Sequence, residues 1–268
     1  MIVQLVNDHF QNYKMYNVPK AQLLIADIPY NVGINAYGSN PSWYIDGDRE
    51  KGESELAGKT FFNTDVNFKI PEFFHFCSKM MRKEPKEKGK APCMIVFCSF
   101  EQQYILIDFA KKHGFNHYIN LVFRKNKSAQ VLKANMRVVG NCEYGMIFYR
   151  EKLPKFNNKG NMVFNCFDWP KPDSLPKVHP TQKPVSLLER FIEIFTDEGE
   201  VVIDPVAGSG TTLLAAHNLN RKAYGFEIIK DMCNQAQEKI LTQTQKNLFC
   251  DYSIGKRPVE TMTGENHG

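Results

Sequence analysis

The stretch V-V-I-D-P-V-A-G-S-G-T-T, at residues 201–212, constrains the fold of this chain more than any other. Three β-branched residues lead to Asp204, a turn of small residues follows, and Thr211 begins an apolar pattern with helical spacing. Gly208 and Gly210 can adopt backbone angles closed to other residues, so the main chain can approach a ligand in front of the helix. The pattern predicts a strand, a tight turn and a helix, which form one half of a doubly wound nucleotide site. A buried strand that ends in a Gly-Ser turn is the alternative.

A second acidic residue indicates the kind of ligand. Glu227 lies in the apolar run A-Y-G-F-E-I, roughly 20 residues after the glycine turn, where a carboxylate can accept hydrogen bonds from ribose hydroxyls. The third glycine of the dinucleotide-binding pattern would fall at Leu213, so the loop lacks the small residue that lets a helix close on a pyrophosphate. The spacing therefore favours an adenosine ligand such as S-adenosylmethionine over a nicotinamide dinucleotide.

The loop D-P-V-A-G-S-G-T-T resembles the D-P-F-x-G-S-G-T-T cofactor loop of the amino-group DNA methyltransferases. Val206 stands where that family usually has an aromatic residue, a change that leaves the backbone geometry of the turn intact. The resemblance implies that S-adenosylmethionine is the cofactor. It assigns these residues to cofactor binding: Asp204, Pro205, Ala207, Gly208, Ser209, Gly210, Thr211 and Glu227.

A second motif, A-D-I-P-Y-N-V-G, follows a strand predicted at residues 22–26 and resembles the D-P-P-Y catalytic loop of the same family. Methylating an exocyclic amine requires acceptors for the amine hydrogens, because the nitrogen lone pair is otherwise delocalised into the base. The Asp27 carboxylate and the Ile28 carbonyl would be these acceptors, and Asp27 is also a candidate cofactor contact. Pro29 ends the strand, and Tyr30 offers a ring to a flipped base. Taken alone, the motif would be explained better by an Asx-Pro turn.

Two further stretches resemble cofactor-binding segments of that family. An aspartate after its first strand meets the adenine amine of the cofactor, a role that falls here to Asp8, after a strand at residues 2–6. A helix N-cap explains Asp8 equally well. The segment H-P-T-Q-K-P, at residues 179–184, resembles the one that closes over the methionine end of the cofactor, which assigns Thr181 and Lys183 to its carboxylate. The alternative is a helix lead-in capped by its threonine.

Three stretches are candidates for DNA contact, although a run of charges is more often only a solvated face. Residues 33–65 predict a mobile lid loop, and two strands at 118–123 and 144–149 predict an antiparallel hairpin at the sheet edge with a basic connection. Residues 151–178 form a small insert that interleaves aromatic residues with lysines, at the place of the family's target-recognition region. The candidate DNA-binding residues are Trp43, Arg124, Lys125, Lys127, Lys133, Arg137, Lys155 and Trp169.

Composition agrees with a single domain over residues 1–268, because 268 residues with 43% hydrophobic side chains can bury one sizeable core. The net charge of +5 is compatible with an anionic partner. The seven cysteines include no C-x-x-C pair, which predicts reduced core thiols, and no histidine has a partner at zinc-ligand spacing. These spacings predict no metal site. Since no apolar run approaches the roughly 20 residues of a membrane span, we expect a cytoplasmic protein that does not enter a membrane.

The motifs occur in the order catalytic loop, recognition segment, cofactor loop, which is the permuted order of the family's beta class. The resemblance implies an α/β fold: a doubly wound, Rossmann-like sheet of about seven mostly parallel strands, with helices on both faces and the catalytic and cofactor strands adjacent. It implies partners as well: DNA, double or single stranded, together with a homodimer and a cognate restriction endonuclease.

The expected reaction is direct methyl transfer from S-adenosylmethionine to N6 of a flipped adenine. Adenine is favoured because Asp27 stands where cytosine-specific relatives usually carry serine. N4 of cytosine in DNA and adenine in RNA remain alternatives, and so does a nucleic-acid-binding protein of the same fold without turnover.

Overall fold

The computed structural model describes residues 2–30, 68–125, 130–131, 139–170, 174–179 and 182–242. The predicted lid at 33–65 lies outside these ranges. Five predicted site residues also lie outside them: Trp43, Lys127, Lys133, Arg137 and Thr181.

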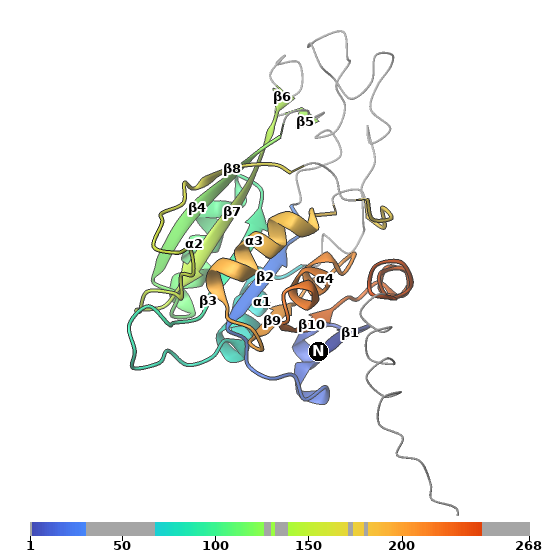
Figure 1. Cartoon of the computed structure of the whole chain (residues 1–268), viewed down its shortest axis with the longest axis horizontal. Helices are drawn as coiled ribbons and strands as arrows, with labels where there is room; N and C mark the ends of the chain where they lie inside the picture. The colour runs from blue at the N-terminus through green and yellow to red at the C-terminus, as the bar shows by residue number, and fades with distance from the viewer. Residues whose placement is uncertain are drawn as a thin grey trace, which may run out of the picture.

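The fold is built on one eight-stranded sheet, in the order β1-β10-β9-β2-β3-β7-β4-β8 (Figure 1). Every neighbouring pair is parallel except the two pairs that involve β7, so the expectation of a mostly parallel sheet is confirmed. The strands span, in sheet order, β1 Val3–Val6, β10 Lys222–Phe226, β9 Val201–Asp204, β2 Leu23–Asp27, β3 Cys93–Cys98, β7 Cys142–Tyr149, β4 His117–Arg124 and β8 Cys166–Asp168.

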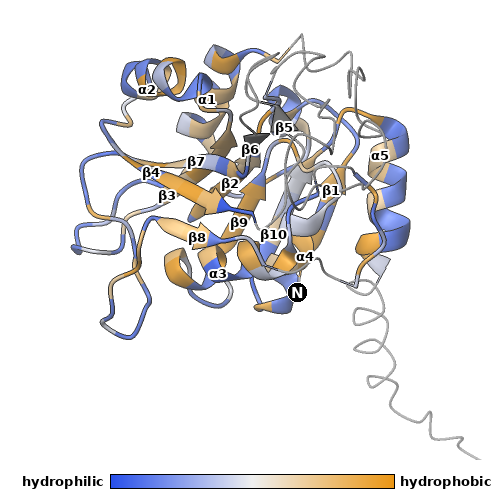
Figure 2. Cartoon of the chain, turned by 90° about the horizontal axis from the view of Figure 1, so that it is seen from above, coloured by the Kyte–Doolittle hydropathy of each residue, from blue (hydrophilic) through white to orange (hydrophobic). Residues whose placement is uncertain are grey.

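Helices cover both faces of the sheet, which explains why central strands such as β2 and β3 are almost uninterrupted apolar runs (Figure 2). Helices α3 (Val185–Phe195) and α4 (Thr211–Asn218) pack on one face, against Leu23 and Ile25 among others. Helices α1 (Ile70–Met80) and α2 (Gln102–Lys112) pack on the other face, against Leu24 and Ala26. Adjacent residues of β2 therefore belong to different cores.

Two shorter helical segments complete the described helices. The 3-10 helix η1 (Phe10–Met15) follows β1 and buries Phe10 in the core beneath α1. Helix α5 (Lys230–Gln235) follows β10 and continues as the π-helical segment η4 (Ala236–Ile240), whose Ile240 packs in the core beneath α3 and α4.

The hairpin of β4 and β7 is antiparallel, as predicted, but it does not form the edge of the sheet. The insert contributes an eighth strand, β8, which pairs in parallel with β4. Phe167 of β8 packs on Phe123 and Phe191, so its half-buried ring attaches this short segment to the core. Two short strands lie in the connection between β4 and β7. These strands, β5 (Gln130–Val131) and β6 (Val139–Gly140), pair with each other as a two-stranded ribbon beyond the sheet (Figure 1).

The cysteines follow the sequence prediction only in part. Cys77, Cys93, Cys98 and Cys233 are buried free thiols, whereas Cys142 is half-buried. Cys166 is exposed, because the edge strand that carries it is covered only where Phe167 points inward. Separately, no helix in the described ranges is long and apolar enough to cross a membrane.

Candidate active site at the carboxyl edge of the sheet

Three neighbouring strands end in acidic residues at one edge of the sheet. Asp27 is the last residue of β2, Asp204 is the last residue of β9, and Glu227 directly follows β10. The strands β10, β9 and β2 are adjacent and parallel, so their carboxyl ends meet at the same edge. In open α/β sheets this edge is where ligands bind. The expected adjacency of the catalytic and cofactor strands is confirmed.

Glu227 fixes the glycine turn between β9 and α4. Its Oε2 accepts a hydrogen bond from the Gly208 backbone N at 2.9 Å, and its Oε1 accepts one from the Ile229 N at 2.7 Å. Gly208 and Gly210 have φ of 51° and 79°, the left-handed region that glycine adopts without strain. Gly210 is the N-cap of α4, and no side chain in the described ranges caps this helix. Backbone donors at the start of α4 are therefore left for a ligand.

A close contact between α4 and β10 supports this turn. A Cβ atom built on Gly225 would lie 2.8 Å from Leu213 Cδ1 and 3.0 Å from Ala207 Cβ. Leu213, at the position of the third glycine of the dinucleotide pattern, is buried in the core and fills the space above Gly225. The helix is thus held away from the strand by a leucine side chain.

The row of carboxylates carries concentrated negative charge. Asp204 is 3% exposed, and its Oδ1 accepts a hydrogen bond from the Val206 N at 3.0 Å. Burial raises the pKa of Asp204 to about 7, and the charges of Asp27 and Glu227 act in the same direction. Burial also raises the pKa of Glu227, against the opposing effect of its backbone donors. A positively charged ligand would relieve this mutual repulsion.

The predicted catalytic loop is anchored on both sides. The Ile28 side chain is buried, and its backbone N donates to the Phe97 carbonyl at 3.3 Å. Gln102 of α2 donates to the Pro29 carbonyl at 2.7 Å. These contacts hold the loop against β3 and α2, although Ile28 replaces the first proline of the D-P-P-Y motif.

Among the described residues, Asp27 has a hydrogen-bond partner for one carboxylate oxygen and none for the other. Its Oδ2 accepts a hydrogen bond from Lys183 Nζ at 2.6 Å. Its Oδ1 is buried, and within the described ranges it has no hydrogen-bond partner. Burial raises the pKa of Asp27, the Lys183 ammonium lowers it, the neighbouring Glu143 carboxylate raises it, and the nearby Tyr30 hydroxyl lowers it. A buried acceptor without a donor is costly, so this oxygen is prepared for a ligand that donates a hydrogen.

Glu143, at the start of β7, is a site residue that the sequence reasoning missed. Its carboxylate contacts Lys183 Nζ at 3.3 Å, accepts a hydrogen bond from the Tyr30 hydroxyl at 3.4 Å and pairs with Lys125. Burial raises the pKa of Glu143, but the ammonium groups of Lys183 and Lys125 outweigh this effect and hold the pKa below its usual value. The available signal was an acidic residue at the start of an apolar strand, beside a basic hairpin connection.

Two predicted cofactor contacts have other partners in the structure. Lys183, which was assigned to the cofactor carboxylate, has a side chain only 4% exposed, and its ammonium binds Asp27 and Glu143 instead. Asp8 accepts hydrogen bonds from the His9 N, from Asn12 and from the Tyr16 hydroxyl, at 2.7, 2.8 and 2.6 Å. These contacts stabilise the turn into η1, but the N-cap of η1 is His9 and not Asp8, so the capping alternative is wrong for Asp8. The adenine contact of Asp8 stays a prediction.

The described DNA-binding candidates differ in their surroundings. Arg124, the last residue of β4, pairs with Asp168 at 2.7 Å, and both side chains are exposed. Lys125 pairs with Glu143, and its ammonium lies 4.6 Å from the centre of the half-buried Trp169 ring. Lys125 and Trp169 therefore support Glu143, whereas Arg124 faces solvent at the same edge as Asp27.

Lys155 is a correction to the predicted DNA surface. Its side chain is 6% exposed, and its ammonium binds Asp197 Oδ2 at 2.5 Å and Glu200 Oε2 at 2.8 Å. Glu200 precedes β9, so this group lies at the amino edge of the sheet, away from Asp27. A buried, doubly paired ammonium at that edge is not available to phosphate, and we exclude Lys155 from the proposed DNA surface.

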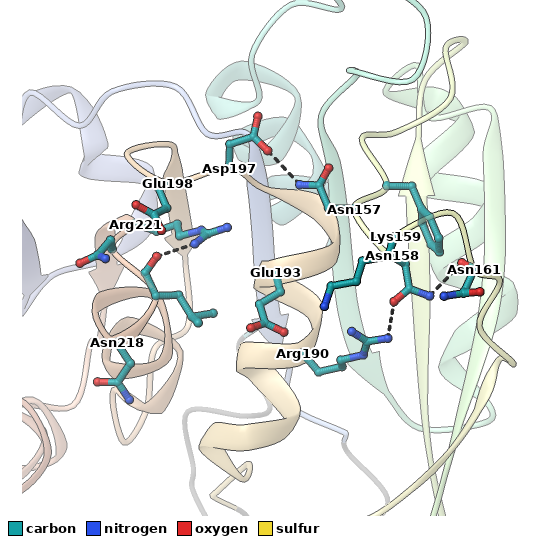
Figure 3. Close-up of a pocket in the computed structure, with 13 residues that line it drawn as sticks. Asn157, Asn158, Lys159, Asn161, Arg190, Glu193, Asp197, Glu198, Asn218 and Arg221 are labelled. Atoms are coloured by element: carbon teal, nitrogen blue, oxygen red, sulfur yellow. Dashed lines mark hydrogen bonds between the residues drawn. The ribbon is translucent and has the colours of Figure 1, made fainter.

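An open polar hollow also lies toward the amino edge, between residues 156–161, the end of α3 and the turns before β9 and β10 (Figure 3). Arg190 donates to Asn158 at 2.6 Å, and Asn157 donates to Asp197 at 2.9 Å. These polar groups satisfy one another, and the hollow is remote from the row of carboxylates. The carboxyl edge is therefore the better candidate for the active site.

The fold and the edge residues define an α/β protein that can place a ligand beside a row of carboxylates. The chain belongs to the DNA methylase family of N6 and N4 methyltransferases, whose sequence model matches residues 21–238. Within the described ranges no group of three or more His, Cys, Asp and Glu side chains could hold a metal ion.

Individual relatives agree with this family. The chain is 26% identical over 239 residues to the DNA adenine methyltransferase YhdJ of Escherichia coli, which covers 82% of this chain and 76% of the relative. It is 44% identical over 64 residues to the type II methyltransferase M.HpaI of Haemophilus parainfluenzae, which covers 24% of this chain and 20% of the relative.

Solved structures show the same fold. The M1.HpyAVI–SAM complex superposes with a TM-score of 0.59 at 23% identity, covering 89% of this chain and 99% of that one. The cytosine-N4-specific PvuII DNA methyltransferase superposes with a TM-score of 0.61 at 16% identity, covering 94% of this chain and 93% of that one.

Proposed function

We propose that this DNA methylase transfers a methyl group from S-adenosylmethionine to the N6 amine of adenine in DNA. The observation that carries the proposal is the state of Asp27: Oδ2 is held by Lys183, while the buried Oδ1 has no partner in the described ranges. This oxygen is a suitable acceptor for a hydrogen of the exocyclic amine. The relative named a DNA adenine methyltransferase, aligned over most of this chain, supports adenine as the target.

The residues at the carboxyl edge fit S-adenosylmethionine. That cofactor supplies a methyl group on a positively charged sulfur, and the row formed by Asp27, Asp204 and Glu227 suits a cation. Each Glu227 oxygen accepts one backbone hydrogen bond and retains a second lone pair, which ribose hydroxyls can use. The uncapped start of α4 and the left-handed glycines allow the backbone to approach the ligand.

The catalytic loop would activate the amine. Asp27 Oδ1 and the Ile28 carbonyl accept the two amine hydrogens, which localises the lone pair on the nitrogen. As the nitrogen attacks, it becomes positive, and its interaction with the Asp27 carboxylate strengthens. Tyr30, held by its hydroxyl against Glu143, presents a ring beside this acceptor.

Nucleoside analysis tests the function directly. DNA incubated with the protein and S-adenosylmethionine is digested to nucleosides and analysed by mass spectrometry, with heat-inactivated protein as the control. We expect N6-methyladenine. N4-methylcytosine would overturn the choice of base, and the absence of both products on varied DNA would overturn the activity.

Arg124 should contribute to DNA binding through phosphate. Because Arg124 is exposed at the catalytic edge, Arg124→Ala should lower the slope of log affinity against log salt by up to about one. Lys83→Ala is the matched control, since Lys83 is an exposed cation between α1 and β3, toward the amino edge. Fluorescence anisotropy across a salt series measures both variants. If Arg124→Ala and Lys83→Ala gave the same slope of log affinity against log salt, Arg124 would pair with Asp168 without contacting phosphate.

The proposed function also includes partners of the protein and its location in the cell. Similarity to type II methyltransferases supports a role in restriction and modification, with a cognate endonuclease as partner. A homodimer also remains part of the proposal and rests on the family resemblance. A cytoplasmic location is proposed because the sequence shows no apolar run of membrane-spanning length.

A further inference from the structure

One ammonium is shared by two carboxylates beside the proposed catalytic oxygen. Lys183 Nζ lies 2.6 Å from Asp27 Oδ2 and 3.3 Å from Glu143 Oε2. The three side chains come from separate parts of the chain: the end of β2, the start of β7 and the segment before α3. Lys183 is 4% exposed and Glu143 is 11% exposed, so water screens this contact poorly.

The cluster alternates in charge from the hairpin to the catalytic loop. Lys125 binds Glu143, Glu143 binds Lys183, and Lys183 binds Asp27. The Lys183 ammonium also lies 5.3 Å from the ring centres of Tyr30 and Phe97, which enclose it further. A buried ammonium with these neighbours has little freedom, so it fixes which Asp27 oxygen remains available.

We propose that Lys183 and Glu143 are positioning residues for Asp27, with opposing effects. Lys183 holds Oδ2 and stabilises the ionised carboxylate. Glu143 shares the same ammonium and thereby leaves Asp27 Oδ1 a stronger acceptor for the target amine. This inference rests on the proposed function of Asp27 and assigns two residues that act through it.

Several other groups contribute to the electrostatics of this cluster. Asp204 on β9 has a pKa raised by burial to about 7, so it titrates in the range where activity would be measured. Burial raises the pKa of Cys98 to about 12 and lowers that of His179 to about 4, so both are neutral near pH 7. The charged and titratable groups to be considered are Tyr30, Cys98, Lys125, Glu143, Lys177, His179, Lys183 and Asp204.

Two substitutions should move the pKa of Asp27 in opposite directions. Glu143→Gln removes a negative neighbour and leaves Lys183 to Asp27 alone, so the pKa of Asp27 should fall. Lys183→Met removes the counter-charge and leaves two carboxylates together, so the pKa of Asp27 should rise. Asp27 accepts hydrogens in its ionised form. The acidic limb of kcat/KM should therefore move to lower pH in Glu143→Gln and to higher pH in Lys183→Met.

Two readouts test the proposal. The first is the pH profile of kcat/KM for DNA at saturating S-adenosylmethionine. The second is an NMR titration of ¹³C-labelled aspartate carboxyls, with the Asp27 signal assigned by Asp27→Asn, which needs no activity and separates Asp27 from Asp204. Glu143→Asp keeps the negative charge at this position, so its pH profile of kcat/KM should match that of the wild type. Glu151→Gln, beyond the far end of β7, is the matched control and should shift neither readout.

The outcomes separate this inference from the proposed function. Opposite shifts of the Asp27 titration support the positioning roles even if the methylated base proves to be cytosine. Shifts in the same direction, or no shift in folded variants, would overturn them. A third outcome would also overturn the proposal: Lys183→Met binds S-adenosylmethionine more weakly, but its Asp27 titration is unchanged. Lys183 would then be a cofactor contact and not a positioning residue for Asp27.

Discussion

Asp27→Ala should lower the rate of methyl transfer by about 10² to 10⁴-fold, the range for losing a positioned proton acceptor. The effect should fall on the chemical step, because the interaction of a carboxylate with the amine strengthens as the nitrogen becomes positive. DNA binding and most of the cofactor affinity should persist, since the loop is also anchored by Ile28 and Pro29. Single-turnover kinetics with preformed ternary complex measure this step.

The matched control for Asp27→Ala is Asp168→Ala. Asp168 ends β8 at the same edge of the sheet, but its side chain is 71% exposed and pairs with Arg124. Its loss removes an equal charge without touching the catalytic loop, so the single-turnover rate should stay close to that of the wild type. Undiminished transfer by Asp27→Ala would remove Asp27 from the mechanism.

Glu227→Ala should weaken binding of S-adenosylmethionine by about 1 to 3 kcal/mol, the cost of leaving buried hydrogen-bonding groups unpaired. Two effects combine here. The ribose hydroxyls lose their acceptor, and the backbone N–H groups of Gly208 and Ile229 lose the carboxylate that fixes the turn. Isothermal titration calorimetry measures the affinity, and a thermal denaturation curve reports whether the variant is folded.

Glu238→Ala provides the comparison for Glu227→Ala. Glu238 is exposed on the π-helical segment after α5, so its removal changes the net charge equally without altering the turn. Its cofactor affinity should match the wild type. If Glu227→Ala binds the cofactor as tightly as Glu238→Ala does, then Glu227 has a purely structural role in the turn.

Elements with strong local signals were predicted well. The strands predicted at residues 22–26 and 118–123 correspond to β2 and β4 within one residue at each end, because an apolar strand is visible within a few residues. The strand, glycine turn and helix at β9 and α4 were also found, since the turn residues and the helix start are adjacent in sequence. These elements could be predicted because the residues that determine each of them are close together in the sequence.

The missed features depend on distant pairing. Strand β8 has three residues, too few to show a period of two, and it forms where Phe167 stacks on Phe123 of the neighbouring strand β4. Glu143 reaches Lys183 only because the hairpin places the start of β7 beside the segment before α3. Lys155 shows the opposite error: a lysine in a basic, aromatic stretch gives no sign that Asp197 and Glu200 will enclose it.

The contact between Leu213 and Gly225 has a consequence for how sequences of this kind can change. The leucine side chain occupies the space that a Cβ atom on Gly225 would need, so neither position can be exchanged on its own without a clash or a void. The two residues are 12 positions apart and belong to a helix and a strand, yet sterically they form a single unit. A larger residue on the strand would therefore need a smaller one on the helix and also a shift at Ala207, whose Cβ would lie 3.0 Å from the added atom.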